Sequence, residues 1–220
     1  MGSVRSLLAR YERHRFALLF WSLLLTLGAH PALNAVIPGA SVLEALLVVN
    51  LVAAILSVAR ESSIRGPLAF GVAFVAVRAG EIMLGVRSLL PLSQALWVAA
   101  SVLATASAVR YALRPGRVDG ERIFAALDAY LLAGLVFGVC YWALELNWPG
   151  SFGAASTIDL GLARAIYFSF VTLATLGYGD IVPVSEPAQG LAILEAVAGQ
   201  LYLTVLVARL VSLYVRPGDA

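Results

Sequence analysis

The stretch Thr175-Leu176-Gly177-Tyr178-Gly179-Asp180 decides how this sequence is interpreted. It places two glycines at alternating positions directly after a short apolar segment, Leu162–Ala174. Glycine adopts positive φ without a Cβ clash. A backbone that alternates between negative and positive φ can therefore turn successive carbonyl oxygens toward one line. Such a row of hard oxygens replaces the water around a dehydrated cation, so the stretch predicts a cation-coordinating loop.

Each residue of the loop has an expected role. The oxygens of Thr175, Leu176, Gly177 and Tyr178 are predicted to hold K⁺, and Gly179 completes the ion-coordinating strand. The Thr175 hydroxyl adds an oxygen at the inner end. The side chains of Leu176 and Tyr178 are expected to point away from the ions and into surrounding protein. Asp180 is expected to lie at the outer mouth, where it ties the loop down and attracts cations.

One copy of this strand supplies one carbonyl per layer, whereas a cage around an ion needs four strands. The chain contains one such loop. The sequence therefore predicts a homotetramer around a central pore, with K⁺ as the permeant ligand and no cofactor.

The composition of the chain excludes most other classes of protein. The chain is 61% hydrophobic and 13% charged, whereas soluble domains are nearer half apolar and a quarter charged. Membrane lipid is therefore its expected solvent, and the formal charge of +2 does not suggest a nucleic-acid partner. Cys140 is the one cysteine, and only two histidines occur. With no HExxH and no Ser/His/Asp constellation, we expect no enzyme activity.

Several apolar segments approach the roughly 20 residues that cross a bilayer. We predict an all-α membrane protein with six transmembrane helices, and Leu162–Ala174 is short enough to be a re-entrant pore helix. Its negative end, near Ala174, would favour a cation, and Asp159 suits its positive end. The predicted spans are Phe16–Leu33, Val42–Ala59, Pro67–Val86, Leu92–Leu113, Arg122–Leu146 and Ala188–Tyr214.

Pro115-Gly116 breaks the chain between the fourth and fifth spans. The predicted parts are an N-terminal segment 1–15, a four-helix domain 16–114, a linker 115–121, a pore domain 122–216 and a tail 217–220. Within the pore domain we expect the pore helix at 162–174, the filter at 175–180 and the inner helix at 188–214.

The arginines predict the orientation of the chain in a cell membrane. With a cytoplasmic N-terminus, the outer loops hold only Arg87 and Arg164. This positive-inside bias predicts that both termini are cytoplasmic. The inner loops would hold Arg5, Arg10, Arg13, Arg15, Arg60, Arg65, Arg110, Arg114, Arg117, Arg122 and Arg216.

Residues Arg122–Tyr214, with their TLGYGD signature, resemble the pore module of the potassium channel superfamily. The six-span plan resembles a bacterial-type channel of the voltage-gated kind, and 16–114 is then a voltage-sensor-like domain. However, Leu92–Val109 carries no Arg or Lys, so we expect weak or no voltage dependence. Ala174 is a second departure, because many relatives have threonine there.

The resemblance also implies a gate in the inner helix. Gly199 lies 19 residues after Asp180, where relatives commonly have a flexible hinge glycine. Close helix packing is the alternative role for Gly199. Helical spacing would turn Gln200, Leu203, Val207 and Val211 toward the cavity, with Val207 and Val211 as a hydrophobic constriction.

Three charged residues are predicted to lie within the membrane. Arg78 and Glu81 are three residues apart and share a helix face. They form either an ion pair or part of a remnant sensor or water-filled crevice. Glu195 is one turn before Gly199 and either braces the inner helix against the pore helix or shapes the charge of the cavity.

These observations favour a potassium-selective channel that conducts K⁺ passively. The alternative is a non-conducting accessory subunit of a transport complex, but such a chain would not need both filter glycines. The short link from Leu113 to Glu121 predicts that each four-helix unit packs on the pore of its own subunit.

Overall fold

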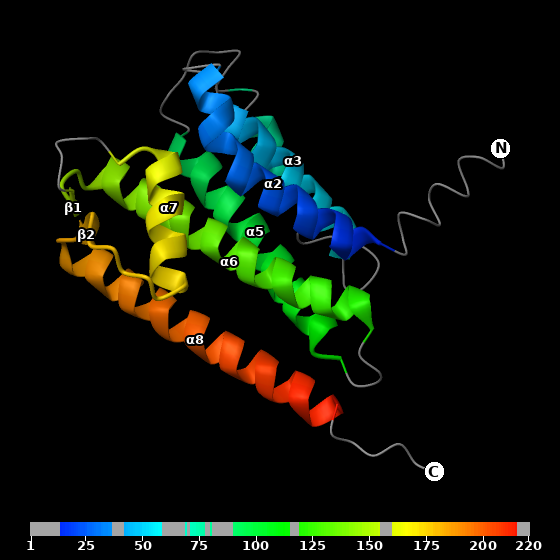
Figure 1. Cartoon of the computed structure of the whole chain (residues 1–220). Coiled ribbons are helices and arrows are strands. Elements are labelled where there is room, and N and C mark those ends of the chain that lie inside the picture. Colours follow the sequence, from blue (N-terminus) through cyan, green and yellow to red (C-terminus); the bar gives the residue numbers. More distant parts are fainter. Residues whose placement is uncertain are drawn as a thin grey trace, which may run out of the picture. The chain divides into compact units, whose positions relative to one another are not determined.

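The computed structural model describes residues 14–36, 42–58, 69, 71–77, 80, 90–114, 119–154 and 160–214. These residues are mostly helical, with one two-stranded sheet (Figure 1). The elements are α2 (Arg15–Val36), α3 (Val42–Val58), α5 (Leu90–Ala112), α6 (Gly120–Asn147), β1 (Phe152–Ala154), α7 (Leu162–Leu173), β2 (Ile181–Pro183) and α8 (Glu186–Tyr214). Residues 71–77 are also helical.

Among the described residues, three helices are long and apolar enough to cross a membrane, by length and composition: Leu92–Ala112, Gly120–Asn147 and Glu186–Arg209. They coincide with the fourth, fifth and sixth predicted spans. The first two predicted spans are helical, but their apolar stretches, Arg15–His30 and Val42–Ser57, are shorter. Much of the third, Pro67–Val86, lies outside the described residues. The six-span count therefore stays a prediction, whereas a multi-pass membrane protein is supported.

The chain divides into two compact units, Met1–Leu131 and Leu132–Ala220, and the division falls inside α6. In the first unit α3 contacts both α2 and α5. A stripe of small residues at four-residue spacing is buried on α5: Ala100, Ala104, Ala108 and Ala112. Small side chains let helix backbones approach closely, and membrane helices depend on such contacts because lipid is as apolar as their side chains.

Polar contacts join the helices of the first unit at two places. Asn50 of α3 donates a hydrogen bond from Nδ2 to Thr26 Oγ1 of α2 at 2.8 Å. At the start of α2, the Arg15 guanidinium lies 5.3 Å from the centroid of the Tyr111 ring. Tyr111 also stacks on Phe16 at 4.8 Å. These contacts hold the start of α2 against the end of α5.

In the second unit the short helix α7 packs against α6 and α8 (Figure 1). Two glycines one turn apart on α6 make this approach possible. A Cβ on Gly138 would lie 2.8 Å from the Cα of Ile166, and one on Gly134 would lie 2.7 Å from the ring of Phe170. Both distances are shorter than van der Waals contact, so α7 can lie here only because these α6 residues have no side chain.

An aromatic cluster supports the outer part of the second unit. The ring of Tyr141 contacts that of Phe168 at 4.9 Å, and the ring of Phe152 contacts that of Phe168 at 5.4 Å, both edge to face. Phe152 begins β1, which pairs antiparallel with β2 so that Phe152 faces Pro183. The cluster therefore fixes the short sheet against α7.

The start of α8 is defined by a local cap. The Ala188 N–H donates to Ser185 Oγ at 3.3 Å, and Glu186 in the first turn suits the positive end of the helix. The helix therefore begins at Glu186, two residues before the predicted start at 188.

We expect Gly138→Ala to lower the free energy of unfolding by roughly 1–3 kcal/mol, the usual cost of overpacking. The added methyl would meet the backbone of Ile166, which cannot rotate away. Thermal unfolding of the purified protein measures the effect.

Gly28→Ala is the matched control, because Gly28 is also helical and a Cβ there would meet nothing within 4 Å. Equal stability of the two variants would contradict the close packing of α6 on α7.

Candidate ion-coordinating segment

The predicted loop begins where α7 ends. The predicted pore helix, 162–174, is observed as Leu162–Leu173 with Ala174 as its C-cap. The Thr175 N–H donates to Thr172 O at 3.0 Å, and the Leu176 N–H donates to Val171 O at 2.9 Å. This pair of bonds is the Schellman arrangement that closes many helices. The N-cap is Gly161, and Asp159 lies outside the described residues.

The backbone after α7 has positive φ at every second residue. Gly177 has φ 57° and Gly179 has φ 75°, which confirms the conformation expected of the two glycines. A Cβ on either glycine would meet nothing within 4 Å, so the backbone angle, and not crowding, requires glycine there.

Thr175 also has positive φ, 58°, which the sequence did not reveal. A β-branched residue in this region is a genuine outlier, and such strain costs on the order of 1–3 kcal/mol. The two Schellman bonds hold Thr175 in this conformation.

The hydrogen bonds of the loop are one-sided. The N–H groups of Ala174, Thr175, Leu176 and Gly177 all donate back to carbonyls in the last turn of α7. Within the described residues, the carbonyls of Thr175, Leu176, Gly177 and Tyr178 accept no hydrogen bond. The loop therefore keeps a run of backbone oxygens available as ligands.

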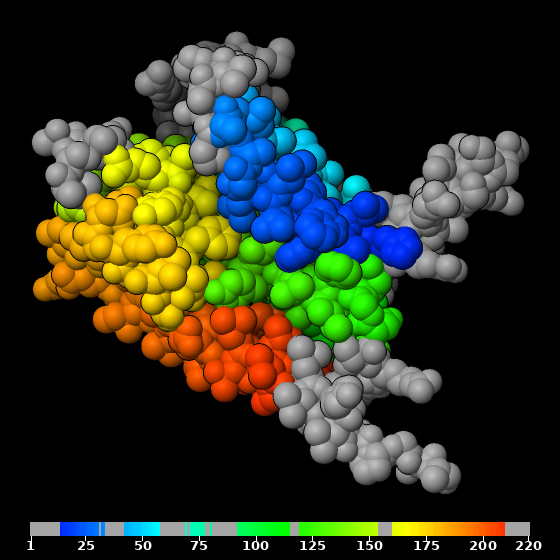
Figure 2. Space-filling model, in the orientation of Figure 1, coloured from blue at the N-terminus to red at the C-terminus, as the bar shows by residue number. Residues whose placement is uncertain are grey.

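The loop lies on an open surface of the second unit. Residues 174–179 are exposed, with Leu176 at 57% and Tyr178 at 67%. Figure 2 shows this region, between the yellow of α7 and the orange of α8, at the surface. Within the described residues of a single chain, the side chains of Leu176 and Tyr178 do not pack into surrounding protein as expected. Their packing stays a prediction, and it would require other copies of the chain.

The C-terminal end of the loop is held by Asp180 and by the sheet. Asp180 is hydrogen-bonded to the side chain of Tyr167 on α7. Desolvation of the phenol, and then this bond to Asp180, raise the pKa of Tyr167, so the phenol stays a neutral donor. Immediately afterwards β2 pairs with β1, and the Val184 N–H donates to Ser151 O at 2.8 Å. Bonds to α7 and β1 thus hold both ends of the loop.

The outer turn that carries β1 is itself fixed by one carboxylate. Glu145, near the end of α6, accepts hydrogen bonds from the Gly150 N–H at 2.8 Å and the Phe152 N–H at 3.2 Å. This turn therefore offers β2 a rigid partner.

Gly199 lies where α8 crosses the end of α7. A Cβ on Gly199 would be 2.6 Å from Leu173 Cδ1, which supports the packing alternative. Gln200 and Val207 are exposed and Leu203 is half-buried, whereas the side chain of Val211 is not described. The cavity and gate roles of these residues stay predictions.

Glu195 is completely buried and contacts two helices. The Tyr141 hydroxyl of α6 donates to Glu195 Oε2 at 2.6 Å, and Ser169 Oγ of α7 is within hydrogen-bond distance of Glu195 Oε1. The contact with α7 agrees with the predicted bracing, whereas the sequence did not indicate the contact with Tyr141.

Other intramembrane charges are less well defined. Asp128 of α6 is buried, and neither of its carboxylate oxygens has a hydrogen-bond partner among the residues that the structure describes. Asp128 was not among the residues predicted from the sequence, although an isolated acidic residue within an apolar span indicates a special role. Arg78 and Glu81 lie outside the described residues, so their pairing stays a prediction.

Residues 125–216 match the family described as Ion channel. Protein LctB of Bacillus caldotenax is 31% identical over 100 residues, which cover 43% of this chain and 74% of that protein. The chain belongs to the ion channel family. The match is to a family of channels and not to a family of enzymes.

Two further relatives each match part of the chain. Two pore potassium channel c of Oryza sativa subsp. japonica is 36% identical over 83 residues, or 38% of this chain and 18% of that protein. Inward rectifier potassium channel Kirbac3.1 of Paramagnetospirillum magnetotacticum is 34% identical over 92 residues, which cover 40% of this chain and 28% of that protein. The chain thus matches less than a third of the length of either. No solved structure matches it significantly.

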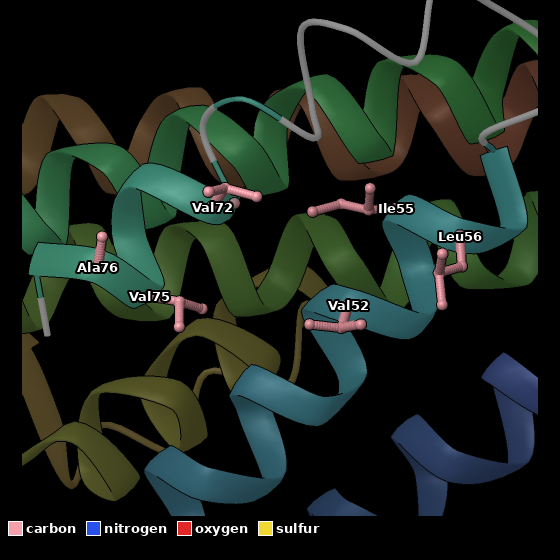
Figure 3. A pocket seen from close by; sticks show the side chains of 7 residues that line it. Val52, Ile55, Leu56, Val72, Val75 and Ala76 are labelled. Carbon is pink, nitrogen blue, oxygen red and sulfur yellow. The ribbon is translucent and has the colours of Figure 1, made fainter. Parts of the chain in front are cut away.

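The first unit has an apolar groove, lined by α3 and helical residues 71–77 (Figure 3). Its volume is about 400 Å³. The lining residues are Val52, Ile55, Leu56, Gly71, Val72, Val75 and Ala76. None carries a polar side chain, so the groove offers no ligand to an ion. Among the described residues, no group of three His, Cys, Asp or Glu side chains could hold a metal ion.

A double-mutant cycle separates the two roles of Gly199. We expect Gly199→Ala to destabilise the channel, because the new methyl meets Leu173. Leu173→Val, which shortens that side chain, should restore part of the loss, with a coupling of about 0.5–3 kcal/mol in thermal unfolding.

Ion flux through the same four proteins completes the cycle. The hinge role would be favoured by two results together. Gly199→Ala would lower K⁺ flux whether or not Leu173→Val is present, and the two substitutions would show no coupling in stability.

Proposed function

We propose that four copies of this chain form a potassium-selective channel that conducts K⁺ passively across the membrane. The observation that carries the proposal is the one-sided hydrogen bonding of this segment. The N–H groups of Thr175, Leu176 and Gly177 bond to α7, whereas the carbonyls of Thr175–Tyr178 accept no hydrogen bond from the described residues. Four such strands around one axis would replace the hydration shell of K⁺.

The relatives support potassium as the ion. Three similar proteins are named as potassium channels. The family match, 125–216, includes the whole ion-coordinating segment. The alternative, a non-conducting accessory subunit, does not explain why the carbonyls of Thr175–Tyr178 accept no hydrogen bond from the described residues.

Two features support a homotetramer. Irregular backbone at membrane depth is tolerated only where protein buries it or a water-filled cavity borders it, and residues 174–179 are exposed in one chain. In addition, only 11% of the apolar stretch of α8 is buried, against 56% for α6. Neighbouring copies around a pore would cover both surfaces. The exposed apolar residues of α8 include Ile193, Leu194, Val197, Leu201, Val205 and Val207.

The arrangement in the membrane follows the sequence predictions. Six spans place both termini in the cytoplasm, and each four-helix domain packs on its own pore. The gate lies in α8, with Val207 and Val211 as the constriction. Arg110, in the last turn, is the one basic residue of α5. Each charge that moves through the membrane contributes about 2.3 kcal/mol per 100 mV, so we expect little voltage dependence.

Purified protein in liposomes tests the function. With a potassium gradient, we expect K⁺ uptake that excludes Na⁺ and is blocked by Ba²⁺, and we expect crosslinking to yield four subunits. Absence of flux across tested voltages, pH values and lipids would favour the accessory subunit.

A pair of glycine variants tests the site. We expect Gly177→Ala to abolish K⁺ flux, because φ 57° strains any residue with a Cβ and the carbonyl would turn away from the axis. Gly150→Ala is the matched control: φ is 86° there, also with nothing near a new Cβ, but the residue lies in the outer turn. Normal K⁺ flux in Gly177→Ala would remove the site assignment.

A further inference from the structure

Three helices of the second unit meet at a chain of five buried oxygen atoms. Tyr141 of α6, Ser169 of α7 and Glu195 of α8 have no exposed surface. The Tyr141 hydroxyl is 2.6 Å from Glu195 Oε2. Ser169 Oγ is within hydrogen-bond distance of Glu195 Oε1 and also lies 2.7 Å from the carbonyl oxygen of Gly134. The chain therefore contains three short oxygen–oxygen contacts.

Each of these contacts needs one hydrogen between its two oxygens, because oxygens this close repel unless one donates. The Tyr141 hydroxyl supplies one hydrogen and the Ser169 hydroxyl supplies a second. The Gly134 carbonyl supplies none. If Ser169 donates to Gly134, its contact with Glu195 lacks a hydrogen unless the carboxyl carries one.

An ionised Glu195 would also lack a cation. Within the described residues, no arginine, lysine or histidine pairs with it, and the titratable groups facing it are Tyr141 and Cys140 of α6. From α7 it meets only the hydroxyl of Ser169. A buried charge without a partner is expensive in a membrane protein. Proton count and charge therefore lead to the same protonation state.

We propose that Glu195 is a neutral carboxylic acid that positions the pore helix α7. Its Oε1–H donates to Ser169 Oγ, and the Ser169 O–H donates to Gly134 O, while Tyr141 donates to Oε2. All three contacts then hold one hydrogen each, and α6, α7 and α8 are joined by a directional relay.

The consequence for conduction rests on the proposed function. Glu195 and Gly199 are one turn apart on α8 and contact Ser169 and Leu173, which are one turn apart on α7. Leu173 is the last residue of α7, directly before the cap of the ion-coordinating segment. A loosened relay therefore lets the end of α7, and with it Thr175, leave its place. Glu195 is a positioning residue and touches no ion.

Glu195→Gln tests the protonation state, because glutamine also offers one acceptor and one donor. We expect it to keep the wild-type stability and the K⁺ to Na⁺ flux ratio. Glu195→Ala, which leaves Tyr141 and Ser169 unpaired, should lower K⁺ flux by about tenfold. Strong loss of flux or stability in Glu195→Gln would overturn the proposal.

The pH dependence of K⁺ flux shows whether Glu195 acts through its hydrogen bonds or only by filling space. A neutral acid contributes its stabilisation below its pKa and loses it as pH rises. With alkaline buffer on both sides of the membrane, the K⁺ flux of the wild type should therefore fall, while the K⁺ flux of Glu195→Gln should stay the same. A parallel fall in both proteins would contradict the role of Glu195.

Infrared difference spectra provide a readout that is independent of conduction. The wild type minus Glu195→Gln spectrum should contain the C=O stretch of a protonated carboxylic acid at neutral pH. A carboxylate band in its place overturns the proposal. If the acid band is present but no variant conducts K⁺, the proposed function fails while the neutral Glu195 stands.

A serine pair controls for the loss of a hydroxyl. Ser169→Ala should shift the acid band and lower K⁺ flux. Ser107→Ala also removes a buried serine that bonds a helix carbonyl, Leu103 O at 2.7 Å, but it lies in the first unit and should leave the band in place. An unchanged band in Ser169→Ala would exclude the relay.

Discussion

Backbone oxygens that coordinate an ion cannot also hold their own strand in place, and the surroundings of Thr175–Gly179 follow from this constraint. Ordinary strands and helices are held by their carbonyls as much as by their N–H groups. Here the N–H groups at the start of the loop bond to the end of α7. At the other end, Asp180 bonds to Tyr167, and β2 pairs with β1. The anchors thus use groups other than the carbonyls that are proposed to face the ion path.

These anchors are only as rigid as α7, and α7 is held by close contacts with α6 and α8. Lipid provides no hydrophobic drive for helix association, so small residues and interhelical hydrogen bonds do this work. Gly134, Gly138 and Gly199 remove the side chains that would keep α7 at a distance. Ser169 and Glu195 add a polar link at the same surfaces. Packing and hydrogen bonding thus act on one short helix.

Much of the second unit could be predicted from the sequence. The pore helix was predicted to within one residue at its C-terminal end, and the positive φ of Gly177 and Gly179 followed from their residue type. The positive φ of Thr175 did not, because threonine rarely adopts it and the hydrogen bonds of the helix end impose it. Asp128 was overlooked because its neighbours were read as one apolar span.

By itself, the sequence determined the apolar helices and the backbone conformation of the two glycines in the candidate ion-coordinating stretch, because hydropathy and the conformational freedom of glycine are local properties of the chain. The tertiary structure decided which partners distant residues take. Gly199 meets Leu173, Glu195 joins Tyr141 to Ser169, and residues 152–154 pair with 181–183. Such contacts depend on distances of a few ångströms between segments that are far apart in the chain, and no local pattern records those distances.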